Sequence, residues 1–436
     1  MGPIEIVAVV TAVMVALILA GVHVAVALGA MSFVGVWLIS GNPQVAINLL
    51  GTTFFNALQS YEFGVIPLFV LMGSLFGHGI SGELFDAANV LLRRVRGGLA
   101  MATVVGNGVF AAITGSSMAS AAAFSRIAFG PMISMGYDRR LAAGAIAGSS
   151  VLGMLIPPSI LFIIYGILTQ ASIGKLFIAG ILPGLLMVVI YCLGIAFMVA
   201  LRPGLVGKAV ARPGGTQRSE LATLLRPWPI IVLIVVVLGG IYRGFFTPNE
   251  AAAVGAAGAL LTAAAKRQLT LARVKQCVVE VGLTTGAIML LLIMAQMYSR
   301  MIALSGIIQG LNQWLTGLAL PGIGVLAFVV VLILAMGTIV DSASILLLVV
   351  PIAFPILTKL GYDPIWLGVV IVIATEMGLV TPPFGLSIFT VKAALGPEVT
   401  LEELFSGSLP FLAMMLLTLV LVIAFPGLST WLVGFM

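Results

Sequence analysis

The helix-breaking sequence GMLIPP at residues 153–158 returns 225 positions later as GLVTPP at residues 378–383. The sequence MGYD at 135–138 returns at the same offset as LGYD at 360–363. A proline pair interrupts a helix, because proline has no backbone N–H and its ring clashes with the preceding turn. Both halves of the chain therefore interrupt a hydrophobic segment at the same place. This predicts a transporter built from two repeats, with ions and substrate bound at the breaks.

The composition is typical of a membrane protein. Of the 436 residues, 61% are hydrophobic and only 8% are charged, which leaves too little polar surface to cover a water-soluble globule. Apolar stretches near the roughly 20 residues that span a bilayer occur throughout the chain. We therefore predict an all-α polytopic membrane protein.

Composition and motifs also exclude several functions. The longest polar interval, residues 202–226, is too short for a nucleotide-binding domain, and the chain has no GxxxxGK[ST] loop, so ATP is not the expected energy source. The net charge of +6 comes from short basic clusters between apolar stretches, as in cytoplasmic loops, so we expect no nucleic-acid binding. Cys192 and Cys277 lack metal-ligand spacing. We expect no cofactor other than coupling ions.

The 225-residue offset divides the chain into a first repeat at 1–225 and a second at 226–436. Each repeat is predicted to contain scaffold helices, a re-entrant helical hairpin, a broken transmembrane helix and a closing helix. In the first repeat these lie at 4–80, 97–130, 140–168 and 177–201, and in the second at 229–305, 322–357, 364–391 and 407–433. Within the scaffold we expect a surface stretch at 43–60 before a span at 62–80, and likewise 268–285 before 287–305.

The basic residues predict the orientation of the repeats. Arginine clusters at 93–96 and 126–140 flank the segment 97–125, so both ends of the first hairpin should face the cytoplasm. Counting the crossings places both ends of the second hairpin outside and the N-terminus in the periplasm. The two repeats are therefore predicted to have inverted topology.

Two short polar sequences lie at the predicted hairpin tips, TGSS at 114–117 and GTIVDSAS at 337–344. At the 225-residue offset Ser116 pairs with Asp341 and Ser117 with Ser342. Carbonyl groups freed by the prolines, together with hydroxyl groups, form a hard-oxygen site suited to sodium, and the N-termini of half-helices could hold a carboxylate.

Asp341 and Glu376 are the only carboxylates that we place deep in the membrane. Such residues are costly there unless they are paired or functional. For Glu376 the sequence leaves two interpretations open. It is either part of the site, or a carboxylate satisfied by a water-filled vestibule or by backbone donors.

Seven segments, in order and spacing, resemble the large membrane subunit, M, of the tripartite ATP-independent periplasmic (TRAP) transporters. They are RGGLA at 96–100, GSSMA at 115–119, GYD at 136–138, LIPPSI at 155–160, SIGKLFIAG at 172–180, TPNEAAA at 247–253 and GLVTPPFG at 378–385. The resemblance covers nearly the whole chain.

The resemblance implies a sodium-driven importer of small organic acids in the bacterial inner membrane. A periplasmic binding protein would deliver substrate to a complex of this subunit and a small four-helix membrane subunit, which we expect as a separate chain because this sequence has no room for its helices. The implied fold is an elevator-type transporter of the ion-transporter superfamily.

The resemblance also implies where the ligands bind. Sodium would lie between each hairpin and its broken helix, and substrate between the two hairpin tips. The implied sodium-binding residues are Thr114, Ser117, Gly153, Ile156 and Pro158 in the first half, and Gly337, Asp341, Gly378, Thr381 and Pro383 in the second. The implied substrate-binding residues are Ser116, Ser159, Ser342 and Phe384.

Three other functions compete with this one. A stand-alone sodium-coupled dicarboxylate carrier has similar architecture but needs no binding protein. An intramembrane hydrolase needs a nucleophile with a base or two close aspartates; the two histidines lie far along the chain from the polar tips, so we do not expect an enzyme. A channel fits less well, because two closed hairpins meeting in mid-membrane indicate alternating access.

Overall fold

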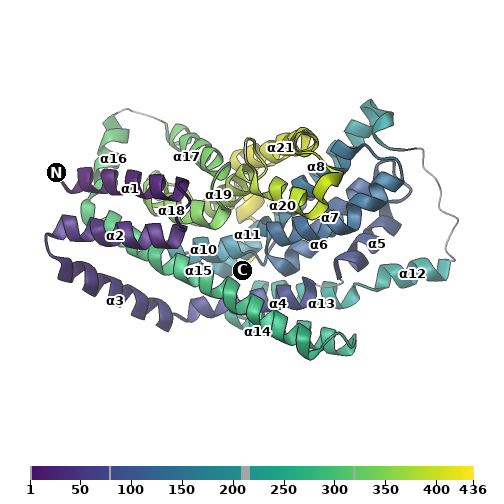
Figure 1. Cartoon of the computed structure of the whole chain (residues 1–436), viewed down its shortest axis with the longest axis horizontal. Coiled ribbons are helices and arrows are strands. Elements are labelled where there is room, and N and C mark those ends of the chain that lie inside the picture. Colours follow the sequence, from purple (N-terminus) through teal and green to yellow (C-terminus); the bar gives the residue numbers. More distant parts are fainter. Residues whose placement is uncertain (1, 78–79, 208–216, 318–320) are drawn as a thin grey trace.

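The computed structural model describes residues 2–77, 80–207, 217–317 and 321–436 (Figure 1). These residues form α-helices joined by turns, and they contain no strand. The prediction of an all-α fold is therefore confirmed.

The helices follow the order expected for two repeats. The first half contains α1 (Pro3–Leu19), α2 (Val24–Ser40), α3 (Pro43–Gln59), α4 (Val65–Gly77), α5 (Ile80–Leu92), α6 (Gly98–Thr114), α7 (Ser117–Ser134), α8 (Arg139–Ser150), α9 (Leu152–Leu155), α10 (Ile160–Thr169) and α11 (Ile173–Leu201). The second contains α12 (Gln217–Leu225), α13 (Trp228–Tyr242), α14 (Pro248–Ala265), α15 (Leu271–Ser305), α16 (Ile307–Gly317), α17 (Gly322–Gly337), α18 (Ser342–Lys359), α19 (Pro364–Gly378), α20 (Leu386–Leu395), α21 (Leu401–Ala424) and α22 (Gly427–Thr430).

Helix boundaries recur at the sequence offset because the same N-caps recur. Both α7 and α18 have 18 residues and begin 225 positions apart, and their N-caps are Ser116 and Asp341. The N-caps of α8 and α19 are Asp138 and Asp363, whose side chains accept hydrogen bonds from the first backbone N–H groups of each helix. Each half therefore has a helical hairpin followed by a broken helix. The exact repeat limits at 225 and 226 stay a prediction.

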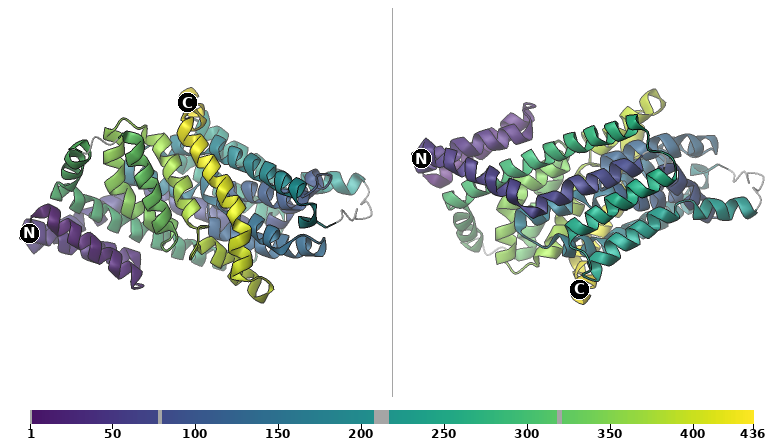
Figure 2. Two further views of the ribbon diagram at one scale, coloured as in Figure 1. Left: turned by 90° about the horizontal axis from the view of Figure 1, so that it is seen from above. Right: turned by 90° about the horizontal axis from the view of Figure 1, so that it is seen from below.

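The two halves interlock instead of lying side by side. The outer helix α2 packs on α15 of the second half, and α14 packs on α4 of the first half. The hairpin arms α7 and α18 pack on α20 and α10, and the broken helix α8 packs on α21. Seen from above, α21 lies between the green helices of its own half and the blue helices of the first half (Figure 2). Each broken helix is thus enclosed by both repeats.

The scaffold departs from the repeat at one point. In the first half α3 is followed by a 3-10 turn and α4, with a bend of 59°. In the second half α15 runs without a break, so the expected division between 268–285 and 287–305 is wrong. Pro67 lies in the first turn of α4, and its ring would clash with the preceding turn if one helix continued through this position. The matching residue of α15 is Leu292, which a continuous helix accommodates.

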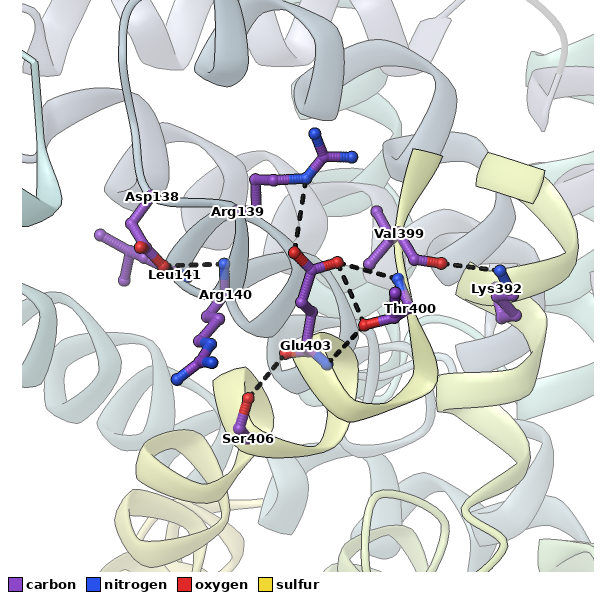
Figure 3. Close-up of polar contacts among 9 residues, drawn as sticks. All are labelled: Asp138, Arg139, Arg140, Leu141, Lys392, Val399, Thr400, Glu403 and Ser406. Carbon is purple, nitrogen blue, oxygen red and sulfur yellow. Dashed lines mark hydrogen bonds and ion pairs between the residues drawn. The ribbon is translucent and has the colours of Figure 1, made fainter. Parts of the chain in front are cut away.

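The closing helix α21 begins six residues before the predicted start at 407 and ends nine before the predicted end at 433. Thr400 and Glu403 form a capping box that starts it. Figure 3 shows this cap beside the N-terminus of α8, where Arg139 Nε lies 3.6 Å from a Glu403 carboxylate oxygen. Lys392 Nζ donates to the Val399 carbonyl at 2.7 Å and so secures the connection from α20. The cap and the charge pair fix this junction between the halves.

The surface is suited to a lipid environment. Within the described residues, six helices are long and apolar enough to cross a membrane, or seven if the bent pair of α3 and α4 counts as one span. Leu193 and Phe197 on α11 and Val235 on α13 are each more than half exposed, as expected for lipid-facing side chains. The broken segment Arg139–Thr169 is mostly buried, so its irregular backbone is shielded from lipid.

The crossing of α8 and α21 predicts a position where only glycine is tolerated. A Cβ atom at Gly144 would lie 2.0 Å from the Gly407 carbonyl oxygen. Gly144→Ala should lower the free energy of unfolding by about 1–3 kcal/mol through overpacking, measured by thermal unfolding in detergent. Gly239→Ala in α13 is the matched control, because a Cβ there has no neighbour within 4 Å and alanine favours a helix by up to about 1 kcal/mol. Equal melting temperatures for the two variants would contradict the prediction.

Candidate functional site

The tip of the first hairpin lies directly against the break in the first broken helix. A Cβ atom at Gly153 would lie 2.7 Å from the Ser116 carbonyl carbon, and one at Gly115 would lie 2.8 Å from the Pro158 carbonyl oxygen. Gly115 also has φ of +56°, a conformation that glycine adopts without strain. Two irregular backbone segments thus approach to van der Waals contact. We refer to this contact as the first junction.

The proline pair determines the chemistry of the first junction. In a helix, the N–H of each residue donates to the carbonyl four residues earlier. Pro157 and Pro158 have no N–H, so the carbonyls of Gly153 and Met154 lack their helical donors. The Ser159 hydroxyl donates to the Met154 carbonyl and also accepts from the Phe162 N–H at 3.4 Å, as the N-cap of α10. Thr114 and Ser159 lie together here with Phe69 of α4, around a space too small to hold a water molecule. The junction therefore gathers carbonyl and hydroxyl oxygens from the hairpin tip and from the break.

The second half forms a matching contact, which we refer to as the second junction. A Cβ atom at Gly337 would lie 2.6 Å from the Gly378 Cα atom, so the hairpin tip and the broken helix meet through two glycines. Asp341 accepts a hydrogen bond from the Ser344 N–H at 3.2 Å and caps α18. The Thr381 hydroxyl donates to the Met377 carbonyl at 2.8 Å. Unlike the buried first break, Pro382, Pro383 and Phe384 are exposed.

Glu376 joins the two hairpin tips. Its carboxylate accepts hydrogen bonds from the Ser117 hydroxyl at the start of α7 and, at 2.8 Å, from the Ser342 hydroxyl at the start of α18. All three side chains are buried, and Glu376 is only 1% exposed. A buried hydrogen bond contributes at least about 0.5–1.5 kcal/mol, so the two bonds hold the tips together through one side chain. The carboxylate is therefore satisfied by side chains from both hairpins, and not by backbone donors. That Glu376 is part of the site stays a prediction.

The structure brings some of the predicted site residues together. Thr114, Gly153 and Pro158 meet at the first junction, with Ile156 in the break itself, and Gly337 and Gly378 meet at the second. Ser117 and Ser342 meet at Glu376. In contrast, the hydrogen bonds of Asp341 and Thr381 stay within their own segments. The Ser159 hydroxyl is occupied by its own helix, and Ser116 caps α7 through the Ala119 N–H.

Sequence reasoning missed a buried polar network in the first half. Asn107 of α6 donates to the Ser149 hydroxyl of α8 at 2.6 Å and accepts from the Ser120 hydroxyl of α7 at 2.7 Å. It thereby ties both hairpin arms to the broken helix. The signal available in the sequence is an amide side chain inside an otherwise apolar helix, which is costly unless its hydrogen bonds are satisfied.

Comparison with known proteins places the chain among transport proteins. Residues 11–428 match the family described as "Tripartite ATP-independent periplasmic transporter, DctM component". The chain is 36% identical to the C4-dicarboxylate TRAP transporter large permease protein DctM of Pseudomonas aeruginosa, over 88% of this chain and 89% of the relative. It is 31% identical to the isethionate TRAP transporter permease protein DctMQ of Oleidesulfovibrio alaskensis, over 95% of this chain and 64% of that longer relative.

A solved structure shares the fold. The Alcanivorax borkumensis YdaH transporter matches with a TM-score of 0.59 at 15% identity, over 100% of this chain and 99% of that one. At this identity the likeness supports the fold alone.

The Asn107 network predicts a stability effect. Asn107→Ala should lower the free energy of unfolding by about 1–3 kcal/mol, because it removes the shared partner of two buried hydroxyls. Thr103→Val is the matched control, since Thr103 lies one turn earlier, is equally buried and donates only to the Leu99 carbonyl of its own helix. Thermal unfolding of both purified variants is the measurement. A loss as large in the control as in Asn107→Ala would count against the network.

Proposed function

The chain belongs to the DctM family, the large permease components of TRAP transporters, and we propose that it imports a small organic acid across the bacterial inner membrane by sodium-coupled secondary transport. Its relatives are named as transport permeases, so the chain is a multi-pass membrane protein and not an enzyme. Sodium coupling, the substrate class, the partners and the orientation in the membrane are parts of the proposal.

The contact between each hairpin tip and the break in its broken helix is the observation that carries sodium coupling. At each break proline removes the helical N–H donors of two backbone carbonyls, and glycine lets the tip approach the break closely. Oxygen atoms from two separate segments suit a small hard cation. A cation bound there would favour the closed contact between tip and helix, which is how ion binding can select one conformation. Two such junctions support at least two sodium sites.

We place the substrate between the two hairpin tips. Ser116, Ser342 and the exposed Phe384 are the residues proposed to contact it, together with Ser159 of the first junction. The relatives' names include a C4-dicarboxylate, isethionate and sialic acid, a sugar acid, and all three are small organic anions. We therefore propose a dicarboxylate or a sugar acid as the substrate class, with C4-dicarboxylates tested first.

The proposed complex has two partners. One is a small four-helix membrane subunit on a separate chain, which the name "large permease protein" of the Pseudomonas relative favours. The other is a periplasmic binding protein that delivers substrate. We propose that the N-terminus is periplasmic and that the hairpins and broken helices move together as an elevator against α1 to α4 and α13 to α15. The packing of each hairpin on the other half supports movement as one body.

Uptake into proteoliposomes tests this function. Vesicles containing the chain and its small partner should accumulate radiolabelled C4-dicarboxylate only when an inward sodium gradient and the cognate binding protein are both present. Uptake with sodium but without the binding protein would favour the stand-alone carrier. Uptake that is indifferent to sodium would overturn the coupling.

The first junction predicts a selective defect in sodium dependence. Gly153→Ala places a methyl group against the backbone of Ser116, so the sodium concentration for half-maximal uptake should rise by about tenfold, a change of about 1.4 kcal/mol. Gly130→Ala is the control, because it lies in the hairpin arm α7 and a Cβ there meets nothing within 4 Å. An unchanged sodium dependence in Gly153→Ala would argue against a sodium site at this junction.

A further inference from the structure

A single carboxylate lies where the two repeats meet. Ser117 and Ser342 are the first residues of α7 and α18 and are related by the 225-residue offset. Both hydroxyls donate to Glu376, one to each carboxylate oxygen. At the 225-residue offset, the residue of the first repeat that matches Glu376 is Val151. Two repeat-related serines thus converge on one carboxylate that has no counterpart.

Glu376 depends on these two serines. Across residues 2–77, 80–207, 217–317 and 321–436, the ion pairs join Arg93, Arg139 and Lys266 to other acidic residues, and none involves Glu376. The carboxylate is fully enclosed in this arrangement, and the two serine hydroxyls are its hydrogen-bond donors. If either hairpin tip moves away, one carboxylate oxygen loses its hydrogen bond in a buried site. The favoured arrangement is the one with both tips in place.

The same carboxylate lies beside both proposed sodium sites. Ser117 belongs to the first set of sodium-binding residues, and Glu376 lies two residues before Gly378, which contacts Gly337 at the second junction. Closing one tip on its broken helix therefore places one of the two donors that Glu376 needs. The second tip then completes the arrangement.

We infer that Glu376 is a positioning residue that couples the two hairpin tips, so that sodium binding at one junction favours binding at the other. This coupling rests on the sodium-driven transport proposed above. Glu376 acts through the two serines and is not itself a sodium ligand. Sodium dependence of uptake should therefore be cooperative, and the cooperativity should require the carboxylate with both hydroxyls.

The test measures initial uptake against sodium concentration at saturating substrate in the reconstituted complex. Glu376→Ala removes both hydrogen bonds, and Ser342→Ala removes only one of them. Glu376→Gln keeps the length of the side chain, and its amide can accept from one serine and donate to the other. Thr375→Val is the matched control, because Thr375 is the buried neighbour of Glu376 and its hydroxyl donates only to the Ile371 carbonyl of its own helix.

The wild type and Thr375→Val should give a Hill coefficient above 1. Glu376→Ala and Ser342→Ala should give a lower Hill coefficient than the wild type and an increase of about tenfold in the half-maximal sodium concentration, within the usual range of coupling between sites. Glu376→Gln should recover most of the cooperativity. If Glu376→Ala does not yield folded protein, Ser342→Ala tests the same coupling on its own.

Three results would overturn the inference. The first is a Hill coefficient of 1 in the wild type, and the second is unchanged cooperativity in both Glu376→Ala and Ser342→Ala. The third is a Glu376→Gln variant as impaired as Glu376→Ala, because the charge and not the bridge would then matter. In each of these cases wild-type uptake still depends on sodium, so the proposed function stands. Wild-type uptake without sodium dependence would instead remove the proposed function together with the coupling.

Discussion

The interruption of a buried helix by paired prolines is the constraint on which the rest of the structure depends. Each break leaves carbonyl groups without helical partners, and in lipid such groups would be costly. The chain meets this constraint by placing a hairpin tip against each break and by enclosing the broken helix with helices from both halves. Glycine is required where the tip and break touch, because a Cβ atom would overlap backbone atoms. The sodium sites proposed above lie at these same two breaks.

Interlocking of the repeats follows from the same constraint. Neither half encloses its own broken helix, since α8 packs on α21 and α19 packs on α11. The repeats therefore cannot move past one another as separate domains. The proposed elevator motion would instead lie between the central helices and the outer ones. The bend between α3 and α4 places a surface arm beside the outer helices (Figure 1). The continuous α15 is its straight counterpart in the second half.

The recurring breaks and polar tips could be predicted from the sequence because they depend on local chemistry. Proline pairs, glycines and N-capping side chains act on their own backbone, so the 225-residue offset located the hairpins and broken helices. The role of Glu376 could not be predicted in this way. Its partner Ser117 is 259 positions away, and only the packing of one half on the other brings them together. Asn107 was missed for the same reason, since its partners lie on two other helices.

The two hairpins are held by different chemistry although their backbones match. In the first half Asn107, Ser120 and Ser149 tie the hairpin to the broken helix. The matching residues of the second half are Leu332, Ile345 and Ala374, which cannot form hydrogen bonds through their side chains. Among the described side chains, only the Ser342 hydroxyl bonds the second hairpin to its broken helix, and its acceptor is Glu376. The second hairpin is therefore less firmly tied, and its break is also the exposed one. In the function proposed above, these differences would make the second hairpin the easier one to open over a substrate.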